Sequence, residues 1–356
     1  MWGPRADLAV FGGSAAVSLA LAGLAPALSK GNTVGPWTFL LLVVGIDVAH
    51  VYSTLFRTYF DRAELGRRPL LYAGVPSACF AILAAVSFLA SKHLWTVLAY
   101  LALLHFVRQQ VGWVAVYRAR ARAAGAPSST FDRVIDDAAI YASTLVPVFY
   151  WHAHLPRNFV WFVEGDFITF PHAAWMESCV NGAFVTLFVC LFLYTANAVR
   201  RALRHPCLEL GKHAVVVTTA ATWFVGIVGT NGDFTFTAAN VIPHGVPYLV
   251  FLYMVARRKA DLAPSGTIAR LLSRGAFGFI ALLIAIAFSE ELLWDRLVWH
   301  SHAEVFGFLA EADLTATALA FVVPLLMVPQ ATHYVLDAVL WRRKDTSAEQ
   351  ARAMGF

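Results

Sequence analysis

Apolar runs of about 20 residues recur from one end of this chain to the other, and that length is needed to cross about 30 Å of hydrocarbon. Only 14% of the 356 residues are charged, against about 25% in a typical soluble domain. We therefore predict an all-α, polytopic integral membrane bundle of about ten transmembrane helices. The predicted spans are 8–29, 36–58, 70–91, 94–117, 134–153, 174–199, 211–231, 234–256, 275–294 and 314–341.

The basic residues support this arrangement of spans, because Lys and Arg concentrate on cytoplasmic loops. With the N-terminus and every second loop on one side of the membrane, that side holds 22 of the 27 Lys and Arg residues and the other side holds 4. The split predicts a multi-pass protein of the inner or cytoplasmic membrane with both termini in the cytoplasm. The net charge of +5 then reflects topology, and no feature of the sequence points to nucleic acid.

The connections between the spans are short, so we expect a single transmembrane domain over 1–356. The segment 155–173 is aromatic and interrupted by Pro and Gly, which is typical of an outer interfacial stretch that caps a bundle. The 4 cysteines have no CxxC spacing. Neither a thiolate metal site nor a disulfide framework is therefore indicated.

A histidine cluster is the main functional signal in the spans. Of the 12 histidines, eight lie at span ends or in loops, where water satisfies them, and four, His50, His105, His244 and His333, lie deep inside predicted spans. An ionisable side chain at that depth is costly and by default faces a partner or a cavity. All four fall on even-numbered spans, which run in the same direction. Counted to the basic residue at each inner boundary, and at about 1.5 Å per helical residue, their depths agree within roughly 6 Å. The four imidazoles are therefore predicted to form one layer.

Two carboxylates share helix faces with histidines of this layer. Asp47 is three residues before His50, and Asp337 is four residues after His333. A buried Asp beside a buried His either ligates the same metal or holds the second N–H of the imidazole. Together these residues predict a metal site, with interhelical polar contacts as the structural alternative.

Three further polar side chains are candidates for the chemistry of this site. Arg108 lies inside a span, where a guanidinium needs an anionic partner such as Asp47, Asp337 or an anionic group of a substrate. A purely structural ion pair is the alternative. We expect Arg108, with Tyr334 or Tyr248, to position the substrate or activated oxygen.

The helix that carries His244 has an unusual local sequence. Pro243 and Pro247 flank the histidine, so we expect this helix to kink or unwind there. Such breaks are tolerated at membrane depth where the backbone lines a cavity inside the protein. Glu290 and Glu291 lie near the outer end of their span and are not expected to reach the histidine layer.

Nitrogen and oxygen ligands without thiolate suit non-haem iron, zinc, manganese or copper. Four histidines with carboxylates in an apolar pocket favour iron, mono- or dinuclear, that handles dioxygen and a lipid-soluble substrate. We therefore expect an iron-dependent oxygenase or other oxidoreductase of lipid metabolism, acting on a lipid, isoprenoid or fatty compound. Its partners would be the substrate, dioxygen, membrane lipids and an electron donor.

The four histidine motifs, AHVYSTL, LLHFVRQ, IPHGVPY and PQATHYVLDAVLW, resemble those of the Brp/Blh-type membrane carotenoid oxygenases. The resemblance covers these short segments only, and it includes the His-x-x-x-Asp of His333 and Asp337. It implies that the four histidines are ligands of non-haem iron. It also implies cleavage of β-carotene to retinal, the reaction of that family.

Two other classes of function remain open. A transporter for a metal ion or a proton also has buried ionisable groups and broken helices, and it predicts a polar path from the histidines to both faces. The outer halves of the even-numbered spans are apolar, which counts against transport. A bis-His haem electron carrier predicts facing histidine pairs and a Soret band in the absorption spectrum.

Overall fold

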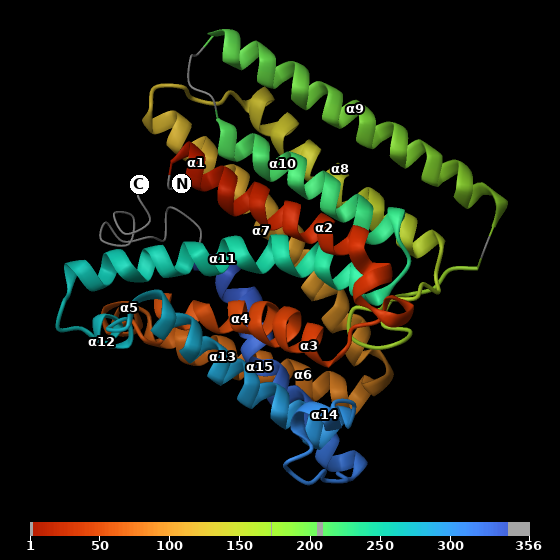
Figure 1. Cartoon of the computed structure of the whole chain (residues 1–356), viewed down its shortest axis with the longest axis vertical. Coiled ribbons are helices and arrows are strands. Elements are labelled where there is room, and N and C mark those ends of the chain that lie inside the picture. The colour runs from red at the N-terminus through yellow and green to blue at the C-terminus, as the bar shows by residue number, and fades with distance from the viewer. Residues whose placement is uncertain (1–2, 172, 205–208, 341–356) are drawn as a thin grey trace. The chain divides into compact units, whose positions relative to one another are not determined.

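The computed structural model describes residues 3–171, 173–204 and 209–340. Over these residues the chain is built from helices and contains no strand, which confirms the predicted all-α class (Figure 1). Four of the 22 basic residues on the predicted cytoplasmic side lie within 342–352, outside the described part of the chain.

Within the described residues, eight helical segments are long and apolar enough to cross a membrane. One of them, Pro69–Ala123, contains 55 residues and includes two predicted spans. It is interrupted at Ala90, where α6 (Pro69–Ala90) ends before α7 (Leu94–Ala123) begins. The predicted span 134–153 lies in α8 (Thr130–Ala153), which is not among the eight. The structure thus supports a polytopic helical bundle. The predicted count of about ten spans stays a prediction.

The chain divides into two compact helical units, which are described separately. Of the described residues, unit 1 contains 3–34 and 99–244, and unit 2 contains 35–98 and 245–340. The single transmembrane domain expected over 1–356 stays a prediction. Helices α7 and α11 (Asp233–Leu262) each contribute residues to both units.

Unit 1 is a set of helices packed around α8. Its other elements are α1 (Pro4–Asp7), η1 (Leu8–Gly12), α2 (Gly13–Leu28), η2 (Lys30–Asn32), α9 (Ala174–Arg204), α10 (Leu210–Trp223) and η6 (Phe224–Gly229). Helix α9 packs along α8, and α8 also contacts α10 and η6 (Figure 1). Helix α8 begins with a capping box, in which Ser129 and Asp132 satisfy each other's backbone N–H groups.

Ion pairs connect α8 and α9 at the end of unit 1 that the charge pattern assigns to the cytoplasm. The Asp132 carboxylate lies 2.5 Å from Nη2 of Arg200 and 3.1 Å from Nη1 of Arg201. Burial alone would raise the pKa of Asp132, but hydrogen bonds from Ser129 and the charge of Arg201 lower it to about 2. Asp132 is therefore ionised throughout the physiological pH range.

Unit 2 contains two principal packings. Helix α6 packs along α15, and α13 packs against η3 and α4. The elements of the unit besides α6 are α3 (Pro36–Thr38), η3 (Phe39–Val48), α4 (Ala49–Ser53), η4 (Thr54–Arg57), α5 (Arg62–Arg67), η5 (Ser91–His93), α12 (Thr267–Leu271), α13 (Gly275–Trp294), η7 (Asp295–Trp299), α14 (Ala303–Phe306) and α15 (Ala316–Leu340).

The helix that carries His50 changes its winding on both sides of that residue. It is π-helical over η3, α-helical over α4, and 3-10 helical over η4. π-Helical turns are rare and often mark functional sites, because they redirect the side chains that follow. The winding of η3 therefore helps to set the directions in which Asp47 and His50 point.

Helix α11 continues as one helix through Pro243 and Pro247, so the expected unwinding at His244 is wrong. Each proline removes one backbone donor from the helix. A side chain from another helix adds a hydrogen bond in this region: Nε2 of Gln109 in α7 donates to the carbonyl of His244 at 2.8 Å. The contact ties α11 to α7 at the level of the histidine.

The outer segment 155–173 has no regular secondary structure over its described residues, and it folds around Asp166. The Asp166 carboxylate accepts the backbone N–H groups of Trp161, Phe162 and Val163 at 2.7–3.3 Å. Burial raises the pKa of Asp166, while these backbone donors favour the ionised form and oppose the rise. The segment thus has a compact turn at its centre.

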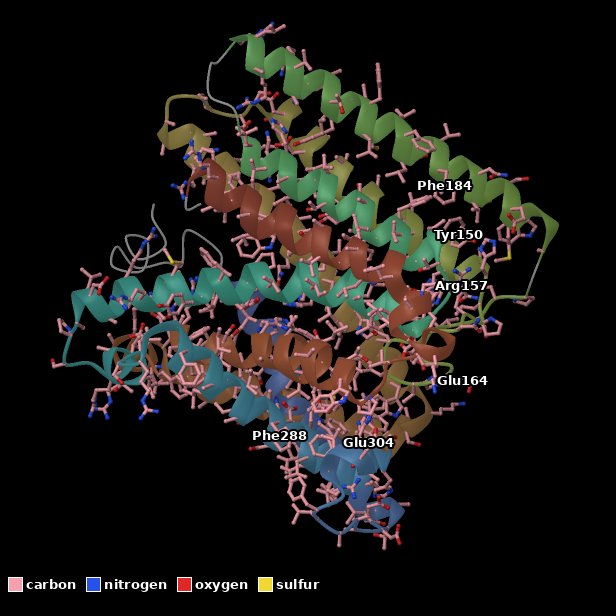
Figure 2. The ribbon with its side chains drawn as sticks, viewed as in Figure 1. Tyr150, Arg157, Glu164, Phe184, Phe288 and Glu304 are labelled. Carbon is pink, nitrogen blue, oxygen red and sulfur yellow. The ribbon has the colours of Figure 1, made fainter. Side chains whose placement is uncertain are left out.

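Arg157 fastens the start of this segment to unit 1. Its Nη2 donates to the carbonyls of Ile227 and Thr230, at 3.0 and 2.6 Å. Its guanidinium also lies over the ring of Tyr150 in α8, 5.4 Å from the centroid (Figure 2). Carbonyls at the end of a helix favour a cation, so Arg157 stabilises the place where η6 ends.

Candidate metal centre

His105 of α7 and His244 of α11 face each other in unit 1. Their ring centroids are 5.2 Å apart, with the ring planes at 80°. One ligand nitrogen of each lies within 4.8 Å of that of the other. A metal ion with bonds of about 2.1 Å to both would hold these nitrogens at most about 4.2 Å apart. A small rotation of either ring therefore suffices to bind one ion.

Phe106 covers one face of the His244 ring. The two rings are stacked, with centroids 3.6 Å apart and planes at 5°. The Phe106 ring also packs edge-on against Trp161 of the segment 155–173, with ring centroids 5.0 Å apart. The stack fixes the orientation of the imidazole and excludes water from that face.

A second histidine pair lies in unit 2, where His50 of α4 meets His333 of α15. The ring centroids are 5.1 Å apart at 82°, and each residue is 2% exposed. The ring of Tyr248 in α11 packs edge-on against both, at 5.9 Å from His50 and 5.5 Å from His333. Three elements far apart in sequence thus meet at this pair.

The carboxylates predicted from sequence spacing lie beside these two histidines. Oδ1 of Asp47 is 3.6 Å from Nδ1 of His50, and Oδ1 of Asp337 is 3.8 Å from Nδ1 of His333. Both acids face the Nδ1 side of their imidazole. This placement suits a carboxylate that orients a ligand histidine, and the part each acid plays toward a metal stays a prediction.

A chain of buried hydrogen bonds links Asp337 to His333. The Tyr248 hydroxyl donates to Oδ1 of Asp337 at 2.7 Å. The Tyr248 oxygen is 3.0 Å from Oγ1 of Thr54, and Oγ1 of Thr54 is 2.8 Å from Nδ1 of His333. Each hydroxyl has a single proton, so the direction of one bond fixes the direction of the next.

The number of protons available to these hydrogen bonds assigns the tautomer of His333. Tyr248 uses its proton on Asp337, so Thr54 must donate to the Tyr248 oxygen. The Thr54 oxygen then accepts from Nδ1 of His333, which therefore carries the ring proton. Nε2 of His333 holds the lone pair, as a metal ligand requires.

Thr54 was not among the predicted site residues, although a sequence signal existed. It follows His50 by four residues, which places it on the same face of the helix. A threonine inside an apolar span is usually explained by a bond to its own helix backbone, so this position does not stand out. The structure instead places its hydroxyl between two side chains from other helices.

A buried guanidinium of unit 2, that of Arg57, lies near the second histidine pair. It is buried, its Nη2 donates to the carbonyl of Leu340, and it interacts electrostatically with Tyr248 and Asp337. Arg57 lies at the inner end of the predicted span 36–58. Arg57 therefore supplies the positive charge that the Asp337 carboxylate needs.

Arg108 has a different environment from the one expected. It is exposed on α7, and its Nη1 donates to the hydroxyl of Tyr141 at 2.9 Å. This partner is neutral, whereas we expected an anion. The side chain does not accompany His105 into the buried pair of unit 1, and a part in positioning substrate stays a prediction.

Tyr334 and two acids of α13 lie near the histidine pair of unit 2, and the Tyr334 ring centroid is 5.8 Å from that of His333. Tyr334 is half-buried, and its hydroxyl accepts a hydrogen bond from Nε2 of Gln330 at 2.7 Å. Glu290 hydrogen-bonds with Tyr52, and Glu291 interacts electrostatically with Asp47. Glu291 thus comes close to Asp47, nearer to the histidine layer than we expected.

Comparison with known proteins does not place the chain in a family: no family model, curated protein or solved structure matches it. The resemblance to Brp/Blh-type carotenoid oxygenases is therefore carried by the four short histidine motifs alone. Function has to be argued from the two histidine pairs and their partners.

Proposed function

We propose that this chain is a membrane-embedded, metal-dependent oxidoreductase, an iron-dependent oxygenase in the first place, that acts on a lipid-soluble substrate. The observation that carries the proposal is the pairing of buried imidazoles, His105 with His244 and His50 with His333, in helices apolar enough to cross a membrane. Burying an imidazole in hydrocarbon is costly unless it has a partner. A metal ion that binds both imidazoles of a pair would offset this cost.

The donor atoms fit a first-row transition metal. Each pair offers imidazole nitrogen, and the pair in unit 2 adds the carboxylates of Asp47 and Asp337. This nitrogen and oxygen set suits non-haem iron first, and also zinc, manganese or copper. When bound, iron with open coordination positions supplies the activation of dioxygen.

The protein's own groups would prepare the site of unit 2 for metal. The Asp337 carboxylate, balanced by Arg57, anchors the Tyr248 hydroxyl, and Thr54 passes that orientation on to His333. Because this series of hydrogen bonds holds the ring proton on Nδ1, Nε2 of His333 can bind a metal ion without a change of tautomer. The aromatic rings around both pairs exclude water and leave an apolar surface for a hydrocarbon substrate.

Elemental analysis of the purified protein, with a visible spectrum, tests the proposal. We expect stoichiometric iron, lowered in His333→Gln and in His244→Gln, and unchanged in the control His93→Gln, which alters an exposed histidine at the end of η5. The ratio of metal to protein gives the nuclearity. Protein without stoichiometric iron, zinc, manganese or copper contradicts the proposal, and a Soret band would replace it with a bis-His haem carrier.

Transport of a proton or metal ion is a second candidate, favoured by one observation. The buried Arg57 interacts with Tyr72 and Glu64 as well as with Asp337. The Tyr72 hydroxyl donates to Glu64 at 2.8 Å, and Glu64 pairs with Arg67 at 2.8 Å. Polar groups therefore continue from Asp337 toward the end that the charge pattern assigns to the cytoplasm.

Ion flux into proteoliposomes separates the two candidates. A transporter would lose proton or metal flux in Glu64→Gln while keeping its fold. An oxidoreductase would show no flux above that of empty liposomes in either the wild type or the variant.

A further inference from the structure

A tyrosine and a histidine outside the predicted metal ligands form a closely matched pair in unit 1. The hydroxyl of Tyr100 in α7 is 2.8 Å from Nε2 of His152 in α8. Nδ1 of His152 is 2.8 Å from the carbonyl of Val148. A carbonyl can only accept, so Nδ1 carries the ring proton and Nε2 accepts the proton of the Tyr100 hydroxyl.

This arrangement suits one-electron oxidation of the phenol. A phenol that loses an electron becomes strongly acidic, so its proton must leave at the same time to a base within hydrogen-bond distance. Nε2 of His152 is such a base, because a neutral imidazole that gains a proton becomes the imidazolium cation. The products are a neutral Tyr100 radical and a protonated His152.

A series of aromatic rings connects Tyr100 with the histidine pair of unit 1. From Tyr100 the ring centroids follow at 5.1 Å to Phe167, 6.3 Å to Trp161, 5.0 Å to Phe106 and 3.6 Å to His244. Between Tyr100 and His244 the series contains two phenylalanines and Trp161, and of these three rings the indole of Trp161 is the one that is readily oxidised. An electron can therefore travel in two short steps, from Trp161 to the metal ligands and from Tyr100 to Trp161.

The described chain holds a second tyrosine–histidine pair that serves as a comparison. The hydroxyl of Tyr194 is 2.7 Å from Nδ1 of His213. This pair lies among the charged groups Asp136 and Glu209. It likewise joins a phenol to an imidazole nitrogen, and it lies outside the ring series that leads to His244.

We propose that Tyr100 is a redox-active tyrosine, which gives one electron to an oxidised metal at His105 and His244 by way of Trp161. The phenol proton passes to Nε2 of His152, so one electron and one proton leave Tyr100 and the metal is reduced by one electron. The inference rests on the proposed function for its oxidant. Tyr100 and His152 would form a redox site separate from the metal ligands. Electron transfer from Tyr100 would also reduce an over-oxidised metal before it could oxidise its own histidine ligands.

The first test uses metal-free protein, so it does not depend on the proposed function. Flash-generated tris(bipyridine)ruthenium(III), with persulfate as electron acceptor, oxidises the protein, and electron paramagnetic resonance detects tyrosyl radicals. We expect a component that is lost in Tyr100→Phe and in His152→Gln, because an amide accepts a hydrogen bond but is not a base. Tyr194→Phe should keep this component. A spectrum unchanged by Tyr100→Phe overturns the proposal.

The second test uses iron-loaded protein mixed with dioxygen and frozen within milliseconds. The same Tyr100 component should appear, and it should be lost in Trp161→Phe, because phenylalanine is far harder to oxidise. A component in the metal-free test without one in the iron test overturns the proposal. The iron content of the same sample decides the proposed function separately. Elution volume and far-ultraviolet circular dichroism confirm that each variant is folded.

Discussion

Replacing Thr54 by valine removes one hydroxyl and keeps the shape of the side chain. In the structure that hydroxyl joins Nδ1 of His333 to the Tyr248 oxygen, at 2.8 and 3.0 Å. Thr54→Val therefore leaves Tyr248 bonded to Asp337 but separates His333 from both. The imidazole loses the contact that fixes its tautomer.

The size of the effect follows from the burial of these groups. Leaving a buried donor such as Nδ1–H of His333 without an acceptor costs about 1–3 kcal/mol of folding free energy. Loss of a group that orients a ligand histidine lowers metal affinity about 10–100-fold. That range corresponds to about 1.4–2.7 kcal/mol of binding free energy. Thr54→Ser, which keeps the hydroxyl, should lie close to the wild type in both measurements.

Competition with a chelator of known affinity measures metal binding, and thermal unfolding of metal-free protein measures stability. Tyr248→Phe interrupts the same chain, so the double variant with Thr54→Val should bind metal about as weakly as either single variant. Additive losses would show that the residues act separately. Equal metal affinity in Thr54→Val and the wild type would refute the assigned tautomer.

Three further predictions use other parts of the molecule. Arg57→Met should lower the free energy of unfolding by about 3–5 kcal/mol, because it leaves the Asp337 carboxylate buried without its cation. The same change at the exposed Arg108 should cost less than about 1 kcal/mol in the same denaturation assay. The lowered pKa of Asp132 stabilises the fold fully above its unfolded value of about 3.9, and this stabilisation is lost as the pH falls through about 2. Asp132→Asn should therefore flatten the acid part of a plot of unfolding temperature against pH. Removing bound metal with a chelator should lower the unfolding temperature of the wild type more than that of His333→Gln.

The helical class and the buried histidines could be predicted because both follow from the cost of polar groups in hydrocarbon. The partner of each histidine could not. Depth along a span comes from counting residues, whereas pairing depends on which helices pack together. His105 thus meets His244, and His50 meets His333, in a way that four equal depths do not specify.

The prediction named Arg108 as the arginine of the site, whereas the buried arginine that interacts with Asp337 is Arg57. This difference has a related cause. A span that is apolar all round has no polar stripe from which its inward face can be read. Arg108 follows His105 by three residues, near enough in sequence to suggest a shared face, yet one side chain is exposed and the other is buried. Arg57 lies next to the inner boundary of the predicted span 36–58, where a basic residue is ordinary, and boundaries are the least certain part of a predicted span.

The π-helical winding of η3 has a consequence for how this chain can change over evolution. A π-helical turn takes up one residue more than the α-helical turn that it replaces. If the same residues were wound as an ordinary α-helix, every later side chain would turn by about the angle of one residue, about 100° at 3.6 residues per turn. Asp47 and His50 would then leave their partners without being mutated themselves. The winding of η3 is thus as strict a requirement as the identity of the ligand residues, and a substitution in this apolar stretch that restores α-helical hydrogen bonding would displace the site.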